Sequence, residues 1–244
     1  MRSILVVVAT IATIAFNALA GTGRLNGVMT NEVSDKYPTV LTPAGYAFSI
    51  WALIYFGLIA FSIYQLFPSK LVRLRGVRTL YIVSCMLNCA WLYAWHSYAI
   101  GTCVILIFAL LATLALINIK LKTAESARDA LFTKAPFGLY FGWVTAASIV
   151  NFFIYLKSVE VQMSSSGWNI LGCVCIAIAL IAALVVRWKL RNFTYPLAVA
   201  WAATGIAIQQ QGNTAIILTA AICVIFCLVL SISFVMDLKT TTHE

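Results

Sequence analysis

Residues 42–55 have the sequence TPAGYAFSIWALIY, an apolar segment that a proline opens and aromatic residues line. At the spacing of an α-helix, Phe48, Trp51 and Tyr55 fall at i, i+3 and i+7, so their rings share one face. Two later segments carry the same kind of aromatic face. Three such faces turned toward one another predict a helical bundle that encloses a flat, hydrophobic ligand.

The composition is typical of a membrane protein. Of the 244 residues, 63% are hydrophobic and only 9% are charged. Apolar runs of roughly 18 or more residues indicate membrane-spanning helices, because a helix satisfies its own backbone hydrogen bonds inside hydrocarbon. We therefore predict an all-α, polytopic membrane helical bundle with about eight transmembrane helices, at residues 4–20, 45–66, 80–96, 98–117, 137–156, 168–186, 193–210 and 214–236.

The basic residues support this division into spans. Lys and Arg accumulate in cytoplasmic loops, and with eight spans all of the 16 Lys and Arg residues except Arg24, Lys36 and Lys157 fall on one side. We expect a multi-pass integral membrane protein of a bacterial cytoplasmic membrane, with both termini cytoplasmic. The net charge of +9 then reflects membrane orientation and contact with anionic headgroups, and no nucleic-acid partner is expected.

The first span permits a second interpretation. Arg2, a short apolar run and the sequence Ala18-Leu19-Ala20 before Gly21 are similar to a signal peptide with its cleavage site. Removal of this segment would leave seven helices and an N-terminus outside. The charge distribution is compatible with either interpretation, so this alternative stays open.

The sequence lacks the residue patterns that ion-coupled transport, metal binding and the common hydrolytic and phosphoryl-transfer reactions require. No charged residue lies within the expected spans, whereas ion-coupled transporters place an ionisable group at depth. The seven cysteines all lie in expected spans, without a CxxC pair or a neighbouring metal-type ligand. No Ser/His/Asp set, carboxylate pair or glycine-rich phosphate loop is present. We therefore predict no catalytic residue, no metal and no required cofactor.

The aromatic faces of the third and fifth spans each include an asparagine. Ser84, Asn88, Trp91 and Trp95 share one face of the third span, and Tyr140, Trp143, Ala147 and Asn151 share one face of the fifth. A buried asparagine in a membrane needs a hydrogen-bond partner, so Asn88 and Asn151 face either a partner helix or a polar cavity. Helix-to-helix contact alone is the competing explanation for both.

Tryptophans near the ends of spans are explained without a ligand-binding role. Trp95, Trp168 and Trp188 lie where the aromatic belt of the membrane interface accounts for them. Trp51, Trp91 and Trp143 lie deeper and share faces with small or amide residues, which favours a binding role.

These motifs resemble those of a known family. The segment Pro43-Ala44-Gly45-Tyr46-Ala47-Phe48-Ser49-Ile50-Trp51, continued to Tyr55, resembles the second-helix signature of the tryptophan-rich sensory protein family (TspO/MBR), the bacterial relatives of the mitochondrial translocator protein. Leu87-Asn88-Cys89-Ala90-Trp91 is similar to its third-helix LNxxW motif. Trp143, Ala147 and Asn151 reproduce its fifth-helix W-x3-A-x3-N spacing, with Tyr140 at the preceding aromatic position.

The resemblance covers residues 4–156 and shows departures inside that range. Tyr46 stands where the family usually has tryptophan, and Tyr93 replaces the proline of its W-x-P motif. We expect a five-helix ligand-binding unit at residues 1–156 and three further transmembrane helices of unknown role at residues 157–244. Those three helices form a second packing layer, a partner surface or part of the pocket.

The resemblance implies a pocket among the helices, covered by the connection at residues 21–41. From its length and glycine content alone, this connection is either a lid or an ordinary flexible exterior loop. It also implies a ligand such as a porphyrin, another tetrapyrrole or a sterol-like lipid, and a sensory or transport role. Aromatic rings stack on such ligands, and without a pocket histidine a tetrapyrrole that is metal-free or already has its axial ligands fits better than haem ligated by the protein. The predicted ligand-binding residues are Tyr46, Phe48, Trp51, Tyr55, Asn88, Trp91, Tyr140, Trp143, Ala147 and Asn151.

Three functions remain open at this point. The leading hypothesis is a membrane receptor or carrier whose partners are membrane lipid and a hydrophobic small molecule. The alternatives are an enzyme that promotes light-dependent porphyrin breakdown and a structural membrane protein that recruits a partner. Product analysis of an illuminated sample distinguishes the first two. Small Gly, Ala and Ser residues on the spans permit close helix contacts, so a homo-oligomer also stays open.

Overall fold

The computed structural model describes residues 2–70, 72–124 and 126–233, and within them the fold contains no β-strand. This confirms the prediction of an all-α, polytopic membrane bundle. The long helices are α1 (Arg2–Gly21), α3 (Ile50–Tyr64), α4 (Arg75–His96), α5 (Ile100–Lys120), α7 (Ala135–Ser158), α8 (Ser165–Leu190), α9 (Thr194–Gln209) and α10 (Thr214–Ile232). The short elements are α2 (Thr30–Asp35), α6 (Ala127–Asp129), the 3₁₀ turns η1 (Gly45–Ser49) and η2 (Pro68–Lys70), and the π-helical turn η3 (Ala130–Lys134).

Seven of the eight expected spans are helices long and apolar enough to cross a membrane, counted over the described residues. The exception is α9, which has 16 residues and a length of about 24 Å at 1.5 Å per residue. A turn with Gly212 in the left-handed region ends it, and most of its surface is buried against neighbouring helices. The expected end of the last span, Met236, lies outside the described residues.

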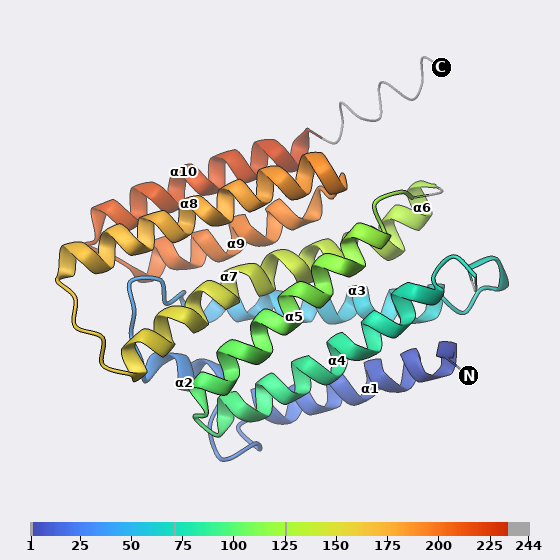
Figure 1. Cartoon of the computed structure of the whole chain (residues 1–244), viewed down its shortest axis with the longest axis horizontal. Helices are drawn as coiled ribbons and strands as arrows, with labels where there is room; N and C mark the ends of the chain where they lie inside the picture. Colours follow the sequence, from blue (N-terminus) through green and yellow to red (C-terminus); the bar gives the residue numbers. More distant parts are fainter. Residues whose placement is uncertain (1, 71, 125, 234–244) are drawn as a thin grey trace.

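Helix α7 lies at the centre of the bundle. It packs against α5 and α3 on one side and against α9 on the other, while α4 lies between α1 and α5. Helices α8 and α10 pack on α9, and together these three form the upper layer in Figure 1. Helix α1 begins and α10 ends at the same end of the bundle, and α2 lies at the opposite end (Figure 1).

The contact between α7 and α9 requires glycine. A methyl group added at Gly142 would collide with the backbone oxygen of Tyr195, and one at Gly138 would collide with the side chain of Asn192. Without side chains at these positions the two helices approach closely, and polar bonds then join them. The Thr145 hydroxyl lies 2.8 Å from the Tyr195 hydroxyl, on the same seam. Helix α9 is therefore packed directly onto the centre of the bundle, and α8 and α10 pack on α9.

Several helices extend beyond the expected spans and include cations there. Helix α4 begins at Arg75, so Arg78 lies within it, buried and donating to Oε1 of Gln65 at 2.6 Å. Helix α8 continues to Leu190, and its buried Arg187 donates to the Leu230 carbonyl at 3.1 Å. Charged residues end a hydrophobic run without ending the helix, which is why the hydrophobic pattern placed the start of α4 too late and the end of α8 too early.

Candidate ligand-binding cavity

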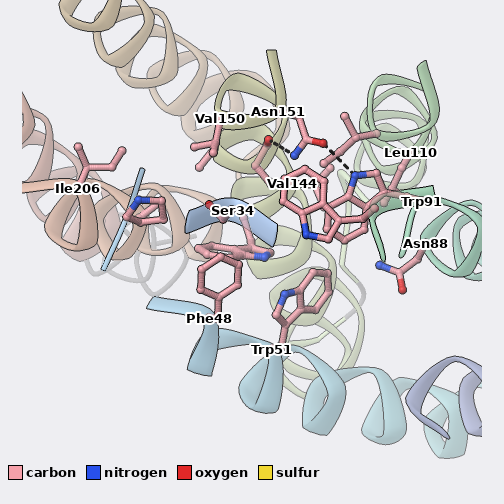
Figure 2. Close-up of a pocket in the computed structure, with 17 residues that line it drawn as sticks. Ser34, Phe48, Trp51, Asn88, Trp91, Leu110, Val144, Val150, Asn151 and Ile206 are labelled. Atoms are coloured by element: carbon pink, nitrogen blue, oxygen red, sulfur yellow. Dashed lines mark hydrogen bonds between the residues drawn. The ribbon is translucent and has the colours of Figure 1, made fainter. Parts of the chain in front are cut away.

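The aromatic faces of α3, α4 and α7 meet around one enclosed cavity of about 40 Å³. Phe48 and Trp51 rise from the η1–α3 segment on one side, and Trp91 and Asn151 lie on the other (Figure 2). The structure brings to this wall seven of the predicted ligand-binding residues, namely Phe48, Trp51, Asn88, Trp91, Trp143, Ala147 and Asn151. The remaining three, Tyr46, Tyr55 and Tyr140, lie elsewhere.

The rings of the wall contact one another mainly edge to face. Trp143 meets Phe48 with ring centroids 5.9 Å apart and Trp51 at 6.3 Å, both at nearly perpendicular angles. Trp91 stacks on Trp95 at 5.4 Å with an interplanar angle of 27°. These are favourable arrangements for aromatic pairs. Each of these rings therefore has another aromatic ring of the wall as a direct neighbour.

The two predicted asparagines have different surroundings. Both polar side-chain atoms of Asn151 form hydrogen bonds. Its Oδ1 accepts from the indole Nε1 of Trp91 at 3.0 Å, and its Nδ2 donates to the Ala147 carbonyl at 2.9 Å (Figure 2). It connects α7 to α4. Asn88 is buried and its Oδ1 accepts from Asn17 at 2.8 Å, but its Nδ2 has no hydrogen-bond partner among the described residues.

A second buried polar atom at the cavity also lacks a partner. The hydroxyl of Ser34, on α2, lines the cavity, is almost fully buried and makes no hydrogen bond within the described part of the chain. Buried polar groups in native proteins are nearly always paired, so each exception needs an explanation. Here one unpaired donor and one unpaired hydroxyl stand in a wall that is otherwise almost entirely apolar.

Three predicted ligand-binding tyrosines do not line the cavity. Tyr46 is 41% exposed and packs its ring edge-on against Trp201 at 5.4 Å. Tyr55 stacks on Trp51 at 5.4 Å, and Tyr140 contacts the edge of Trp51 at 5.8 Å. Tyr55 and Tyr140 therefore contact a cavity residue, Trp51, without lining the cavity themselves.

The connection between α1 and α3 forms the roof of the cavity. Its helix α2 contributes Ser34 and its later part contributes Pro43 to the cavity wall. The roof is tied down on both sides, because the indole Nε1 of Trp95 donates to the Thr30 carbonyl at 3.0 Å and Gln210 donates to the Thr39 carbonyl at 3.0 Å.

Trp95 corrects an expectation from the sequence. It was assigned to the aromatic belt because it lies near a span end, but it is only 2% exposed and lines the cavity beneath α2. Trp168 is likewise buried, with the Nζ of Lys157 4.2 Å from the centroid of its ring. Of the three, Trp188 alone is largely exposed, at 62%. The belt explanation is wrong for Trp95 and Trp168 because the roof and the neighbouring helices cover them.

Helix α9 closes the side of the cavity that α3, α4 and α7 leave open. Ala202 and Ile206 line the cavity, with Ile206 on the α9 side of Figure 2. The helix is also fastened to the roof, since the Trp201 indole donates to the Ala47 carbonyl at 2.8 Å and the Ala44 amide donates to the Gly205 carbonyl at 3.0 Å. One of the last three helices is thus part of the pocket.

Several cavity residues were not identified from the sequence. Trp95 shares the face of Asn88 and Trp91, so its spacing was a usable signal. The other missed residues are small, aliphatic or on the roof, and nothing in their local sequence marks them: Ser34, Pro43, Ile107, Leu110, Val144, Ala146, Val150, Ala202 and Ile206. Among residues 2–70, 72–124 and 126–233, no three His, Cys, Asp or Glu side chains gather as a metal site.

Comparison with known proteins gives a family-level likeness. A family model described as TSPO-like protein matches residues 3–234 of the chain. The matched segment extends beyond residue 156, where the resemblance of the motifs ended, and includes α8, α9 and α10. No curated protein and no solved structure matches the chain.

Proposed function

Because the chain belongs to the TSPO-like protein family, we propose that this membrane protein binds a flat hydrophobic ligand with a polar substituent in the cavity between α3, α4, α7 and α9. The proposed ligand class is a metal-free porphyrin or other tetrapyrrole, or a sterol-like lipid. The proposed role is sensing or transport of that ligand.

The observation that carries this proposal is the pair of unpartnered polar groups in an aromatic wall. The Nδ2 of Asn88 and the hydroxyl of Ser34 are buried at the cavity without a partner among the described residues. Leaving a buried polar group unpaired costs about 1–3 kcal/mol. A propionate or hydroxyl of a bound ligand would accept from these donors and recover that free energy.

The apolar part of the wall supports the same ligand class. Trp51, Trp91 and Trp143 come from three different helices and all line the cavity. An aromatic ring pair contributes about 0.5–1.5 kcal/mol beyond the burial of its area. A flat macrocycle that contacts several of these rings gains from each of them, whereas a small polar solute does not.

The size of the cavity sets a condition on binding. At about 40 Å³ it holds a few water molecules, whereas pockets for drug-sized ligands occupy roughly 300–1,000 Å³. Entry of a porphyrin therefore requires the roof to move. The roof begins with Gly23, Asn26 and Gly27, all with positive φ, and we propose that this turn is the hinge of a lid.

Titration with protoporphyrin IX tests the proposal. We expect saturable binding to the detergent-purified wild type, and a loss of affinity of about tenfold or more in the double variant Trp51→Ala, Trp143→Ala. Because these substitutions remove fluorophores, affinity is taken from the porphyrin absorbance, with tryptophan quenching as a second readout. The control is Trp188→Ala, which removes an exposed indole outside the cavity. Equal affinity in the wild type and the folded double variant would overturn the proposal.

A further inference from the structure

A second concave surface lies on the outside of the bundle, between α3 and the segment formed by α6 and η3. Its volume is about 750 Å³, and it shares no described lining residue with the aromatic cavity. The α6 segment, which forms one of its walls, lies at the end of the bundle where α1 begins and α10 ends (Figure 1). The inference drawn from it goes beyond the proposed function.

The greater part of this groove is apolar. Phe56, Ile59, Ile63 and Phe67 line it, and all four are exposed, with Phe56 at 71%. From Phe56 to the end of α3 the helix rises about 12 Å, and Phe67 continues the apolar lining beyond that end. The hydrocarbon of one membrane leaflet is about 15 Å thick, half of the bilayer core. The apolar part therefore matches the length of an acyl chain within one leaflet.

The other end of the groove is cationic. Lys70 and Arg128 line it together with the hydroxyl-bearing residues Ser69 and Ser126, and no carboxylate is among its described lining residues. Ser126 and Arg128 are exposed, and Lys70 is half-exposed, with its Nζ 5.7 Å from the Tyr64 ring centroid. The groove thus changes from apolar to cationic at the end of α3.

The acidic residue that follows Arg128 in the chain, Asp129, is paired within the protein. Asp129 is fully buried, and its Oδ1 forms an ion pair with Arg73 at 2.5 Å and accepts from the Tyr64 hydroxyl at 3.2 Å. It holds the α6–η3 segment against α3, which fixes one wall of the groove. Among the described residues, the accessible polar groups that line this end of the groove are the cations Lys70 and Arg128 and the hydroxyls of Ser69 and Ser126.

We propose that this groove binds an anionic phospholipid, with one acyl chain along Phe56, Ile59 and Ile63 and the headgroup phosphate at Lys70 and Arg128. A membrane supplies such lipids at high local concentration, and basic residues at the headgroup level attract them. The long apolar stems of Lys and Arg allow their charges to reach the headgroup while the chain stays in hydrocarbon. The cations select for net negative headgroups, while the apolar part accepts the chain of any phospholipid.

Native mass spectrometry of the full-length protein tests the selectivity. The protein is incubated with equimolar dioleoyl phosphatidylglycerol and dioleoyl phosphatidylcholine, and the lipids retained are counted. We expect the wild type to retain phosphatidylglycerol preferentially. In the double variant Lys70→Gln, Arg128→Gln its occupancy should fall by about fivefold for each cation removed, with phosphatidylcholine unchanged. Retention of phosphatidylglycerol at the wild-type level by this variant would overturn the proposal.

The control variant is Lys122→Gln, Lys189→Gln. It removes the same charge from two residues that line a different surface cleft, so it separates a local site from general attraction by a basic surface. We expect this control to keep the wild-type preference. An equal loss in the control and in the groove variant would show nonspecific attraction and would also contradict the proposal.

A second pair of variants tests the apolar part and does not depend on charge. Ala60 lines the groove and Ala52 is exposed elsewhere on α3. We expect Ala60→Trp to fill the groove and displace both lipids, and Ala52→Trp to leave the retained lipids unchanged. Undiminished lipid retention in folded Ala60→Trp protein would mean that the groove is not the binding site. Porphyrin affinity stays unaffected in either variant, so the outcome is independent of the proposed function of the cavity.

Discussion

Nδ2 of Asn17 on α1 donates a hydrogen bond of 2.8 Å to Oδ1 of Asn88 on α4. The same Nδ2 also donates to the Thr13 carbonyl at 2.9 Å, which fixes the orientation of the Asn17 amide. Asn88 must therefore present its oxygen to α1 and its Nδ2 toward the aromatic side chains, as Figure 2 shows. Helix α1 thus determines the polarity of a cavity to which it contributes no described lining residue.

The first prediction concerns Nδ2 of Asn88, a buried donor without a hydrogen-bond partner among the described residues. Asn88→Leu should weaken binding of protoporphyrin IX by about tenfold, because a hydrogen bond to a charged acceptor contributes about 1.5–3 kcal/mol. The same variant should bind etioporphyrin, a macrocycle with only alkyl substituents, as well as the wild type does. Absorbance titration of both ligands measures the difference. Equal losses for the two porphyrins would show that Asn88 shapes the cavity and does not bind a polar substituent.

The second prediction concerns the bond between Trp91 and Asn151. Trp91→Phe removes the indole donor and leaves Oδ1 of Asn151 buried without it, so the protein should lose about 0.5–1.7 kcal/mol of stability. Asn151→Ala should remove the same interaction, and the double variant should cost less than the sum of the two single variants. Equilibrium unfolding in mixed micelles measures all three. Strict additivity would show that the two side chains are energetically independent.

The third prediction concerns the close approach of α7 and α9. A Cβ at Gly142 would overlap the backbone of Tyr195, which a side-chain rotation does not relieve. Gly142→Ala should therefore lower the melting temperature by roughly 5–10 °C, from an overpacking cost of about 1–3 kcal/mol.

Gly101→Ala is the matched control for this variant. A Cβ there would lie 3.7 Å from a ring carbon of Tyr155, which is an ordinary van der Waals contact. Since alanine also has the higher helix propensity, the melting temperature should stay the same or rise slightly. A comparable loss of stability in both variants would mean that the α7–α9 seam has no special requirement for glycine.

The fourth prediction concerns the roof. Trp201→Phe removes the 2.8 Å hydrogen bond from α9 to the Ala47 carbonyl. If a hydrogen bond of about 1 kcal/mol favours the closed roof, the open population and the association rate of protoporphyrin should each rise about fivefold. Stopped-flow absorbance measures the rate, and Trp188→Phe is the control at an exposed position. An unchanged association rate would place the entry route away from α9.

The helix order and the aromatic and amide residues of the cavity wall on α3, α4 and α7 were predictable from local sequence. Long apolar runs mark spans regardless of their neighbours, and aromatic residues at helical spacing on α3, α4 and α7 indicate faces that pack together. Asn88 and Asn151 were predicted to face a helix or a cavity, and each of them lines the cavity and contacts another helix. Which of the two keeps a free donor depends on Asn17, whose role no local pattern shows.

The positions that were harder to predict depend on tertiary structure. Gly45–Ser49 is a 3₁₀ turn with three residues per turn, so Tyr46 and Phe48 are rotated relative to an α-helical wheel and Tyr46 points toward Trp201. Trp95 is buried because α2 folds over it. Ala202 and Ile206 are ordinary apolar residues, and only the packing of α9 against α7 brings them to the cavity.

The position of Ile206 has a consequence for any shortened form of this protein. A fragment that ended after α7 would lack the side chains of Ala202 and Ile206, and acyl chains from the surrounding bilayer would enter the gap. Bulk lipid would then compete with every added ligand, so a titration of that fragment would report displacement of lipid and underestimate the intrinsic affinity. Helix α9, which lies beyond the five-helix portion, therefore completes the wall of the same cavity.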